Sequence, residues 1–181
     1  MNHFLRSAIL CLSVVIPATT LASTDVSVGY GAIPSVNFIS GYRAGYDFRH
    51  TWGTFNIGVE QTVFTPRLMV GINYSLTSAP SIHASSASQG RDVKATWHSL
   101  LASARYNYYT DTRMSVYGRI GIGVTIGYLT PDWEDSYNIT RFGFQFSPIG
   151  IDYRIVGSLS GYLEGGLGVQ GIVQLGLRLK L

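Results

Sequence analysis

The chain has 181 residues, enough for one domain. Hydrophobic residues make up 46% of it, charged residues only 13%, and glycine occurs 21 times, which excludes a disordered chain, a coiled coil and a helical bundle. The formal net charge of +3 is too small and too scattered for a nucleic-acid-binding surface, so we expect no nucleic-acid partner.

Residues 1–22 have the layout of a secretory signal peptide. Arg6 is basic, an apolar run covers residues 7–16, and small residues lead to Ala22, after which we expect cleavage. An ordinary buried N-terminal helix is the alternative. The only cysteine, Cys11, lies in this segment, so residues 23–181 contain no thiol. No later apolar run is long enough for a transmembrane helix, which leaves a closed β-barrel as the way into a membrane.

The rest of the chain alternates between apolar residues and polar residues or glycine, the period of a β-strand. In chain order the alternating segments are 26–30, 55–60, 68–77, 99–108, 114–128, 142–153, 159–167 and 173–181. The clearest is 114–128, where Ile120 and Ile122 lie on one face and Arg119 and Gly121 on the other. This segment exceeds the roughly 9–11 residues that a tilted transmembrane strand needs. The pattern therefore predicts eight strands.

One segment changes phase. Phe142, Phe144 and Phe146 are apolar at even positions, whereas Ile149 and Ile151 are apolar at odd positions. A shift of one residue reverses the faces of a strand, and a β-bulge at Pro148 would absorb it. Two separate short strands are the alternative interpretation.

The connections alternate in length. Short turns are expected near residues 65–66, 110–112 and 156–157, and longer links at 31–52, 79–93 and 129–138, while the last link, near 168–171, is tight. Short periplasmic turns and longer outer loops are typical of transmembrane barrels. Residues 32–50 fit either a loop with a short helix or an extension of the first two strands.

The distribution of charge indicates which face points inward. The polar face carries charged residues and the apolar face almost none, as in a membrane barrel whose apolar face meets lipid. Tyr30, Tyr74, Tyr108 and Tyr128 at strand ends fit an interfacial aromatic girdle. We therefore predict an all-β fold, an eight-stranded antiparallel up-and-down transmembrane β-barrel, over residues 23–181. A soluble barrel with its apolar face inside is the alternative.

The inward charges predict a buried ion-pair network, since an unpaired buried charge is too costly to persist. We expect three acids, Glu60, Asp152 and Glu164, to pair with four arginines, Arg105, Arg119, Arg141 and Arg178; Lys180 lies on the same face. In an eight-stranded lumen this network favours a polar plug over the alternative of a selective pore.

Two segments resemble a known family. The first is FQFSPIGI at residues 144–151, and the second is residues 165–177, which begins with Gly-Gly-Leu-Gly. Both are similar to elements of small outer-membrane β-barrel proteins of Bacteroidetes-type bacteria, and more broadly to OmpX-like and OmpA-like barrels. The resemblance covers roughly residues 52–181. It implies location in the outer membrane and insertion by the barrel-assembly machinery, but no single activity. We expect a monomer in the outer membrane of a Gram-negative bacterium, with outer-membrane lipid and lipopolysaccharide as partners.

Catalytic and metal-binding motifs are scarce. Of the three histidines after residue 22, His50 and His83 lie in expected loops, and His98 and Ser99 point to opposite faces of one strand, so they cannot form a catalytic pair. The histidines lack metal-ligand spacing, so we expect no enzyme activity, no metal and no cofactor.

One loop stands out as an exposed contact site. It carries Asp132, Trp133, Glu134 and Asp135, and a weak cation site or a merely solvated loop are the alternatives. The sequence thus favours a structural or surface-interaction barrel. A channel for small solutes or hydrophobic compounds and a lipid A-modifying enzyme are the alternative functions.

Overall fold

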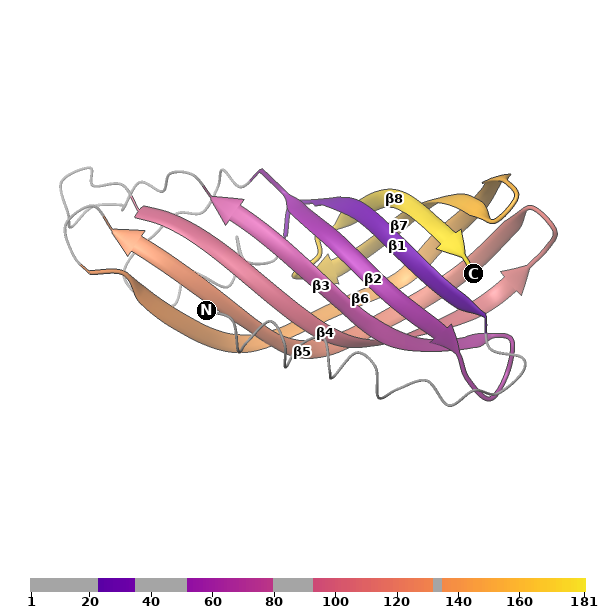
Figure 1. Cartoon of the computed structure of the whole chain (residues 1–181), viewed down its shortest axis with the longest axis horizontal. Helices are drawn as coiled ribbons and strands as arrows, with labels where there is room; N and C mark the ends of the chain where they lie inside the picture. Colours follow the sequence, from indigo (N-terminus) through magenta and orange to yellow (C-terminus); the bar gives the residue numbers. More distant parts are fainter. Residues whose placement is uncertain (1–22, 35–51, 80–92, 132–134) are drawn as a thin grey trace.

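The computed structural model describes residues 23–34, 52–79, 93–131 and 135–181, which form a closed barrel of eight antiparallel strands (Figure 1). The strands are β1 (Thr24–Ala32), β2 (Thr54–Thr62), β3 (Leu68–Ala79), β4 (Val93–Thr110), β5 (Met114–Pro131), β6 (Tyr137–Val156), β7 (Leu159–Gly168) and β8 (Val173–Lys180). Each strand pairs with its neighbours in the chain, and β8 pairs with β1. The predicted up-and-down barrel is confirmed. Within the described ranges, no helix has the length and apolar character needed to cross a membrane.

The barrel is polar inside and apolar outside. Along β5, Ile120 and Ile122 are 55% and 61% exposed, whereas Tyr117 and Arg119 are buried. The same alternation continues around the barrel and leaves a belt of exposed apolar side chains, among them Val28, Ile57, Ile72, Leu100, Phe144, Phe146, Leu163, Leu175 and Leu177. A soluble barrel would bury these residues, so the belt is the surface that faces lipid.

Aromatic residues border this belt at both ends. Tyr30, Trp52, Tyr74 and Tyr128 lie toward the end with the long links, and Tyr106, Tyr108, Tyr109 and Tyr153 lie toward the short turns. On β4, His98 contacts Tyr74 and Tyr128 and so marks one border of the belt, and Tyr108 marks the other. The two residues are ten positions apart, which at about 3.3 Å per residue and a tilt near 40° corresponds to roughly 25 Å along the barrel axis. That height matches the lipid-facing band of outer-membrane barrels.

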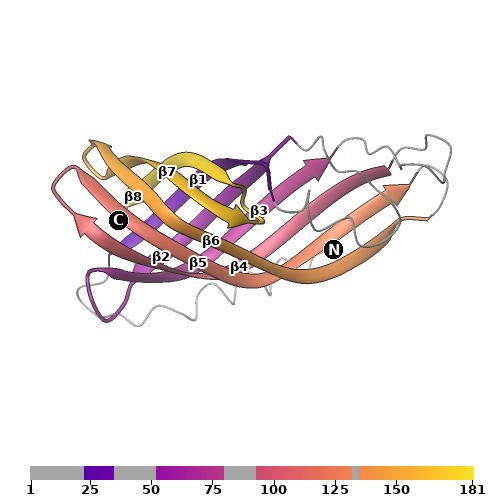
Figure 2. The same ribbon diagram turned by 180° about the vertical axis from the view of Figure 1, so that it is seen from behind.

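The wall of the barrel is uneven in height. β4, β5 and β6 have 18, 18 and 20 residues, whereas β1 has 9 and β8 has 8. Figures 1 and 2 show β4, β5 and β6 running past β1, β7 and β8 at the end opposite the short turns at 63–67, 111–113 and 157–158. The outer ends of these three strands therefore project beyond the lipid-facing belt.

The predicted bulge at Pro148 is confirmed. β6 is one continuous strand, and its pairing with β5 shifts register between Ser147 and Gly150. Phe146 is exposed before this shift and Ile149 after it, so the apolar residues stay on the lipid face. The alternative of two separate strands is excluded. Further register shifts, at Tyr108 of β4 and at Ile155 of β6, were not predicted. Of the ambiguous segment 32–50, residues 35–50 lie outside the described ranges.

Candidate functional site

The centre of the lumen is organised around Arg105 of β4. This side chain is 1% exposed and contacts three carboxylates from three other strands. It forms an ion pair with Asp25 of β1, and its Nε lies 3.2 Å from Glu60 Oε2 of β2. Its Nη1 donates to Asp152 Oδ2 of β6 at 3.2 Å. Alternation places all four residues inside, so a single guanidinium joins opposite walls of the barrel.

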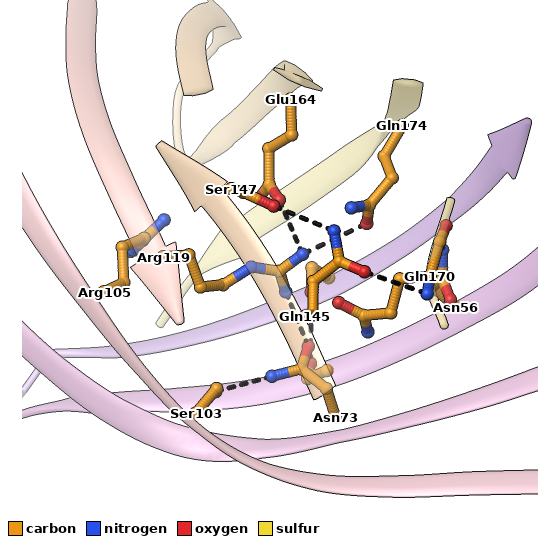
Figure 3. Close-up of polar contacts among 12 residues, drawn as sticks. Asn56, Asn73, Ser103, Arg105, Arg119, Gln145, Ser147, Glu164, Gln170 and Gln174 are labelled. Carbon is orange, nitrogen blue, oxygen red and sulfur yellow. Dashed lines mark hydrogen bonds and ion pairs between the residues drawn. The ribbon is translucent and has the colours of Figure 1, made fainter. Parts of the chain in front are cut away.

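Arg119 and Arg178 extend this arrangement toward β7 and β8. Arg119 of β5 donates to Glu164 Oε2 at 2.6 Å and to Gln174 Oε1 at 3.1 Å, as Figure 3 shows. Arg178 of β8 forms an ion pair with Asp152, and its Nη2 lies 3.8 Å from Glu164 Oε1. The lumen cluster, as we call it, consists of Asp25, Glu60, Asp152, Glu164, Arg105, Arg119 and Arg178.

Two tyrosines pack within the lumen cluster. The hydroxyl of Tyr117 donates to Glu164 Oε1 at 2.8 Å, and the guanidinium carbons of Arg105 and Arg178 each lie 5.1 Å from the centre of its ring. The ring of Tyr162 lies 4.9 Å from Arg178. Cation–π contacts of this kind strengthen when water is excluded, so these rings both fill space and stabilise the cations.

The charges of the lumen nearly balance. Four carboxylates face three guanidinium groups, and Lys180, which lies cross-strand from Asp25, adds a fourth cation on the inward face of β8. All seven side chains of the lumen cluster are buried. Removal of one partner from such an arrangement costs about 3–5 kcal/mol, because it leaves a buried charge without compensation.

The link between β7 and β8 closes the lumen above the lumen cluster. Gly168 and Gly171 have φ angles of 145° and 107°, which let the chain turn inward. The backbone N–H of Gln170 donates to Gln145 Oε1 at 3.0 Å, and its side-chain amide donates to Ser75 Oγ at 3.2 Å. Asn56 Nδ2 donates to the carbonyl of Gln170 at 3.4 Å. Inward side chains of β2, β3 and β6 thus hold the turn inside the barrel.

The structure brings together six of the seven residues expected in the network: Glu60, Arg105, Arg119, Asp152, Glu164 and Arg178. Arg141 is on the inward face of β6 but forms no ion pair with Glu60, Asp152 or Glu164. It lies eleven residues along β6 from Asp152, near the projecting end of the strand, and is half-buried there.

Sequence reasoning missed the roles of four residues of the interior. Asp25 has the same parity as Ser27 and Gly29, so extension of the first alternating segment by one residue would have found it. Tyr117 and Tyr162 have the same parity as Arg119 and Glu164 on their strands, but parity alone indicates no role for them. No pattern in the sequence indicates that Gln170, in a turn, points inward.

The outward face holds the histidine considered for catalysis. Tyr74 Oη and His98 Nδ1 are hydrogen-bonded at 2.6 Å, and the ring of Tyr128 meets His98 edge-on at 5.4 Å between centroids. Ser99 is buried on the opposite face, bonded to Thr125. In the parts of the chain that the structure describes, no group of three or more acidic, histidine or cysteine residues could hold a metal. Asp135 is exposed. His50, His83 and residues 132–134 lie outside the described ranges.

Comparison with known proteins identifies the family. Residues 8–167 match the family described as outer membrane protein beta-barrel domain. The chain belongs to this family. It is an outer-membrane β-barrel protein, and the outer membrane is its location.

The chain is similar to solved structures. A major outer membrane protein from Thermus thermophilus is 11% identical, covers 88% of this chain and 99% of its own, and has a TM-score of 0.57. Ail, the attachment invasion locus protein of Yersinia pestis, solved with the heparin analogue sucrose octasulfate, is 13% identical, covers 88% and 94%, and has a TM-score of 0.49. No curated protein sequence matches the chain.

Proposed function

We propose that this protein is a non-conducting, non-enzymatic barrel that serves as a structural and surface-contact element of the outer membrane. The observation that carries the proposal is the filled lumen. Arg105, Tyr117 and Glu164 are each at most 1% exposed, and the turn at Gln170 lies above them. A conducting pore needs a continuous water-filled path, and an eight-stranded barrel is just wide enough for side chains to fill.

The contacts with partners are made at the projecting end of the wall. The projecting ends of β4, β5 and β6 are the ones that adjoin the links at 80–92 and 132–136. Residues 132–135, with three carboxylates and Trp133, are the contact site that we propose in these links. Lipopolysaccharide is the proposed partner, since its phosphates can share divalent cations with carboxylates. Export through the signal peptide at 1–22, insertion by the barrel-assembly machinery, a monomeric state and the absence of a cofactor belong to the same proposal.

The outward orientation of His98 supports the proposal that the protein is not an enzyme. Nucleophilic catalysis needs a base within hydrogen-bond reach of the nucleophile. His98 faces outward and bonds Tyr74, whereas Ser99 faces inward and bonds Thr125. These two side chains are therefore on opposite sides of the barrel wall and cannot act together on a lipid.

Single-channel recording in planar lipid bilayers tests the plug. We expect no stable, reproducible conductance from the folded protein. Gln170→Ala, which removes the bond to Ser75, should add only brief openings, and Gln61→Ala on the outward face should add none. A reproducible conductance of the unaltered protein would instead favour the channel.

A binding experiment tests the contact site. The variant Asp132→Asn/Glu134→Gln/Asp135→Asn should bind purified lipopolysaccharide in magnesium buffer more weakly than the unaltered protein. Neutralisation of Asp111, in a short turn at the opposite end, is the matched control and should change nothing. Equal binding by all three proteins would remove the loop from the proposal.

A further inference from the structure

The lipid-facing belt contains a depression over β3, β4 and β5. Its floor is formed by Ala102 and Ala104, two small side chains on the outward face of β4. Ala102 lies between Ile72 and Ile122 in the strand register, and Ala104 lies between Val70 and Ile120. Larger side chains therefore stand on both sides of a groove that is one strand wide.

The groove ends toward the short turns at the link between β2 and β3. Phe64 in this turn lines the groove and is 98% exposed. Its φ of 58° is unusual for a bulky residue, and backbone bonds from Val63 N to Leu68 O at 2.9 Å and from Leu68 N to Thr65 O at 3.1 Å hold the turn around it. Strain of this kind persists where the surrounding structure imposes it, often at ligand-binding sites. The turn thus presents an aromatic ring beside the groove.

The polarity of the groove changes along its length. At the short-turn end its lining includes Ser23, Gln61, Thr62 and Thr65, and the hydroxyls of Ser23 and Thr62 are 2.9 Å apart. Toward the middle of the belt the lining is aliphatic. The volume of about 1140 Å³ lies slightly above the roughly 300–1,000 Å³ of small-molecule sites. One polar end and one apolar end are what a membrane lipid requires.

We propose that the groove binds one phospholipid from the leaflet on the short-turn side. One acyl chain lies over Ala102 and Ala104, and the headgroup meets the polar residues around Thr62. The groove is continuous with the belt that already faces lipid, which identifies the occupant as membrane lipid. Transfer of an acyl chain from bilayer to groove gains no hydrophobic energy, so close packing and headgroup hydrogen bonds must retain the lipid. This site is separate from the lumen and independent of whether the barrel conducts.

Photolabelling tests the site directly. The folded protein is reconstituted in phosphatidylethanolamine vesicles that contain a trace of the same lipid with a diazirine on one acyl chain, illuminated, digested and mapped by mass spectrometry. We expect adducts to concentrate on residues 63–72, 100–106 and 120–122. The variant Ala102→Leu/Ala104→Leu fills the floor and should reduce this labelling about tenfold, which corresponds to about 1.4 kcal/mol.

A matched control separates the groove from the rest of the belt. Val124→Leu enlarges an outward side chain of β5 that does not line the groove, and its labelling should equal that of the unaltered protein. Each protein is first shown to be folded by its mobility on an unboiled gel. Labelling spread evenly around the belt, or labelling that the filled variant retains, would overturn the proposal. Labelling of the groove only after removal of residues 1–22 would show that the leader segment occupies it instead, which also overturns the proposal.

Discussion

Replacement of Arg105 by methionine should destabilise the barrel strongly, and more so at neutral than at acidic pH. Of the three arginines of the lumen cluster, only Arg105 forms ion pairs with Asp25 and Glu60. Asp152 also pairs with Arg178 and therefore retains a partner when Arg105 is removed. Asp25 and Glu60 are also cross-strand neighbours, so their repulsion is no longer offset once the guanidinium is gone. Two buried carboxylates therefore lose their ion-pair partner, and Lys180, cross-strand from Asp25, is the cation that remains beside them.

The loss of unfolding free energy cannot exceed the cost of protonating the two carboxylates, because protonation removes their buried charge. Neutralising a free carboxyl of ordinary pKa near 4 costs about 4 kcal/mol at pH 7 and about 1.4 kcal/mol at pH 5. For two carboxyls the upper limit is about 8 kcal/mol at pH 7 and about 3 kcal/mol at pH 5. The first value is a large part of the stability of a typical domain, so Arg105→Met should be strongly destabilised at pH 7 and partly rescued at pH 5.

Urea unfolding in lipid vesicles, followed by tryptophan fluorescence at both pH values, measures these differences. The triple variant Asp25→Asn/Glu60→Gln/Arg105→Met removes the stranded charges together with the guanidinium and should recover most of the lost stability at pH 7. A loss in Arg105→Met below about 1 kcal/mol, far less than a broken buried ion pair should cost, would refute the reasoning. So would a loss that is the same at both pH values.

Three further outcomes follow from the wall of the barrel. Ile122→Arg, at an exposed position within the belt, should cost about 2–4 kcal/mol in urea unfolding, whereas Thr130→Arg, beyond the belt, should cost at most about 1 kcal/mol. Gly31→Ala should lower stability by about 1–3 kcal/mol, because a Cβ there would lie 1.7 Å from the carbonyl oxygen of Gln170, while Gly165→Ala, with its nearest neighbour at 3.6 Å, should fold normally. Deletion of Pro148 should leave the folded band on unboiled gels, since it removes the extra residue of the bulge and keeps Ile151 outward and Asp152 inward, whereas insertion of one alanine after Gly150 should abolish that band because it turns Asp152 toward lipid.

The sequence predicted every strand because lipid and lumen impose opposite chemistry on alternate residues. It predicted their lengths less well, and β5 shows why. Up to Tyr128 the outward residues are apolar, but Leu129 is buried and Thr130 is exposed. Past the belt the outer face meets water, so the polarity of the two faces reverses although the strand continues. The same reversal on β4, with Trp97 buried and Lys94 exposed, hid the first residues of that strand.

The membership of the lumen cluster was easier to predict than its pairing. Strand parity alone places Arg105 and Asp152 inside, but these residues come from strands that are not neighbours. Their contact depends on how the barrel closes and on the lengths of the side chains across the lumen, which no local pattern contains. The position of Gln170 depends on two left-handed glycines and on partners far away in the chain, so it was beyond prediction for the same reason.

The uneven wall also decides where the closed cylinder is weakest. The seam between the first and last strands joins segments of 9 and 8 residues, whereas β4 and β5 share strands of 18 residues each. The seam is also formed by residues about 150 positions apart, such as Val26 and Leu179, so its formation carries the largest loss of chain entropy. Closure of this short seam is the natural last step of assembly, and amide hydrogens there should exchange with solvent before those of β4 and β5. The long strands β4 and β5 then form the scaffold on which the barrel assembles, and the short seam between β1 and β8 closes last and opens first.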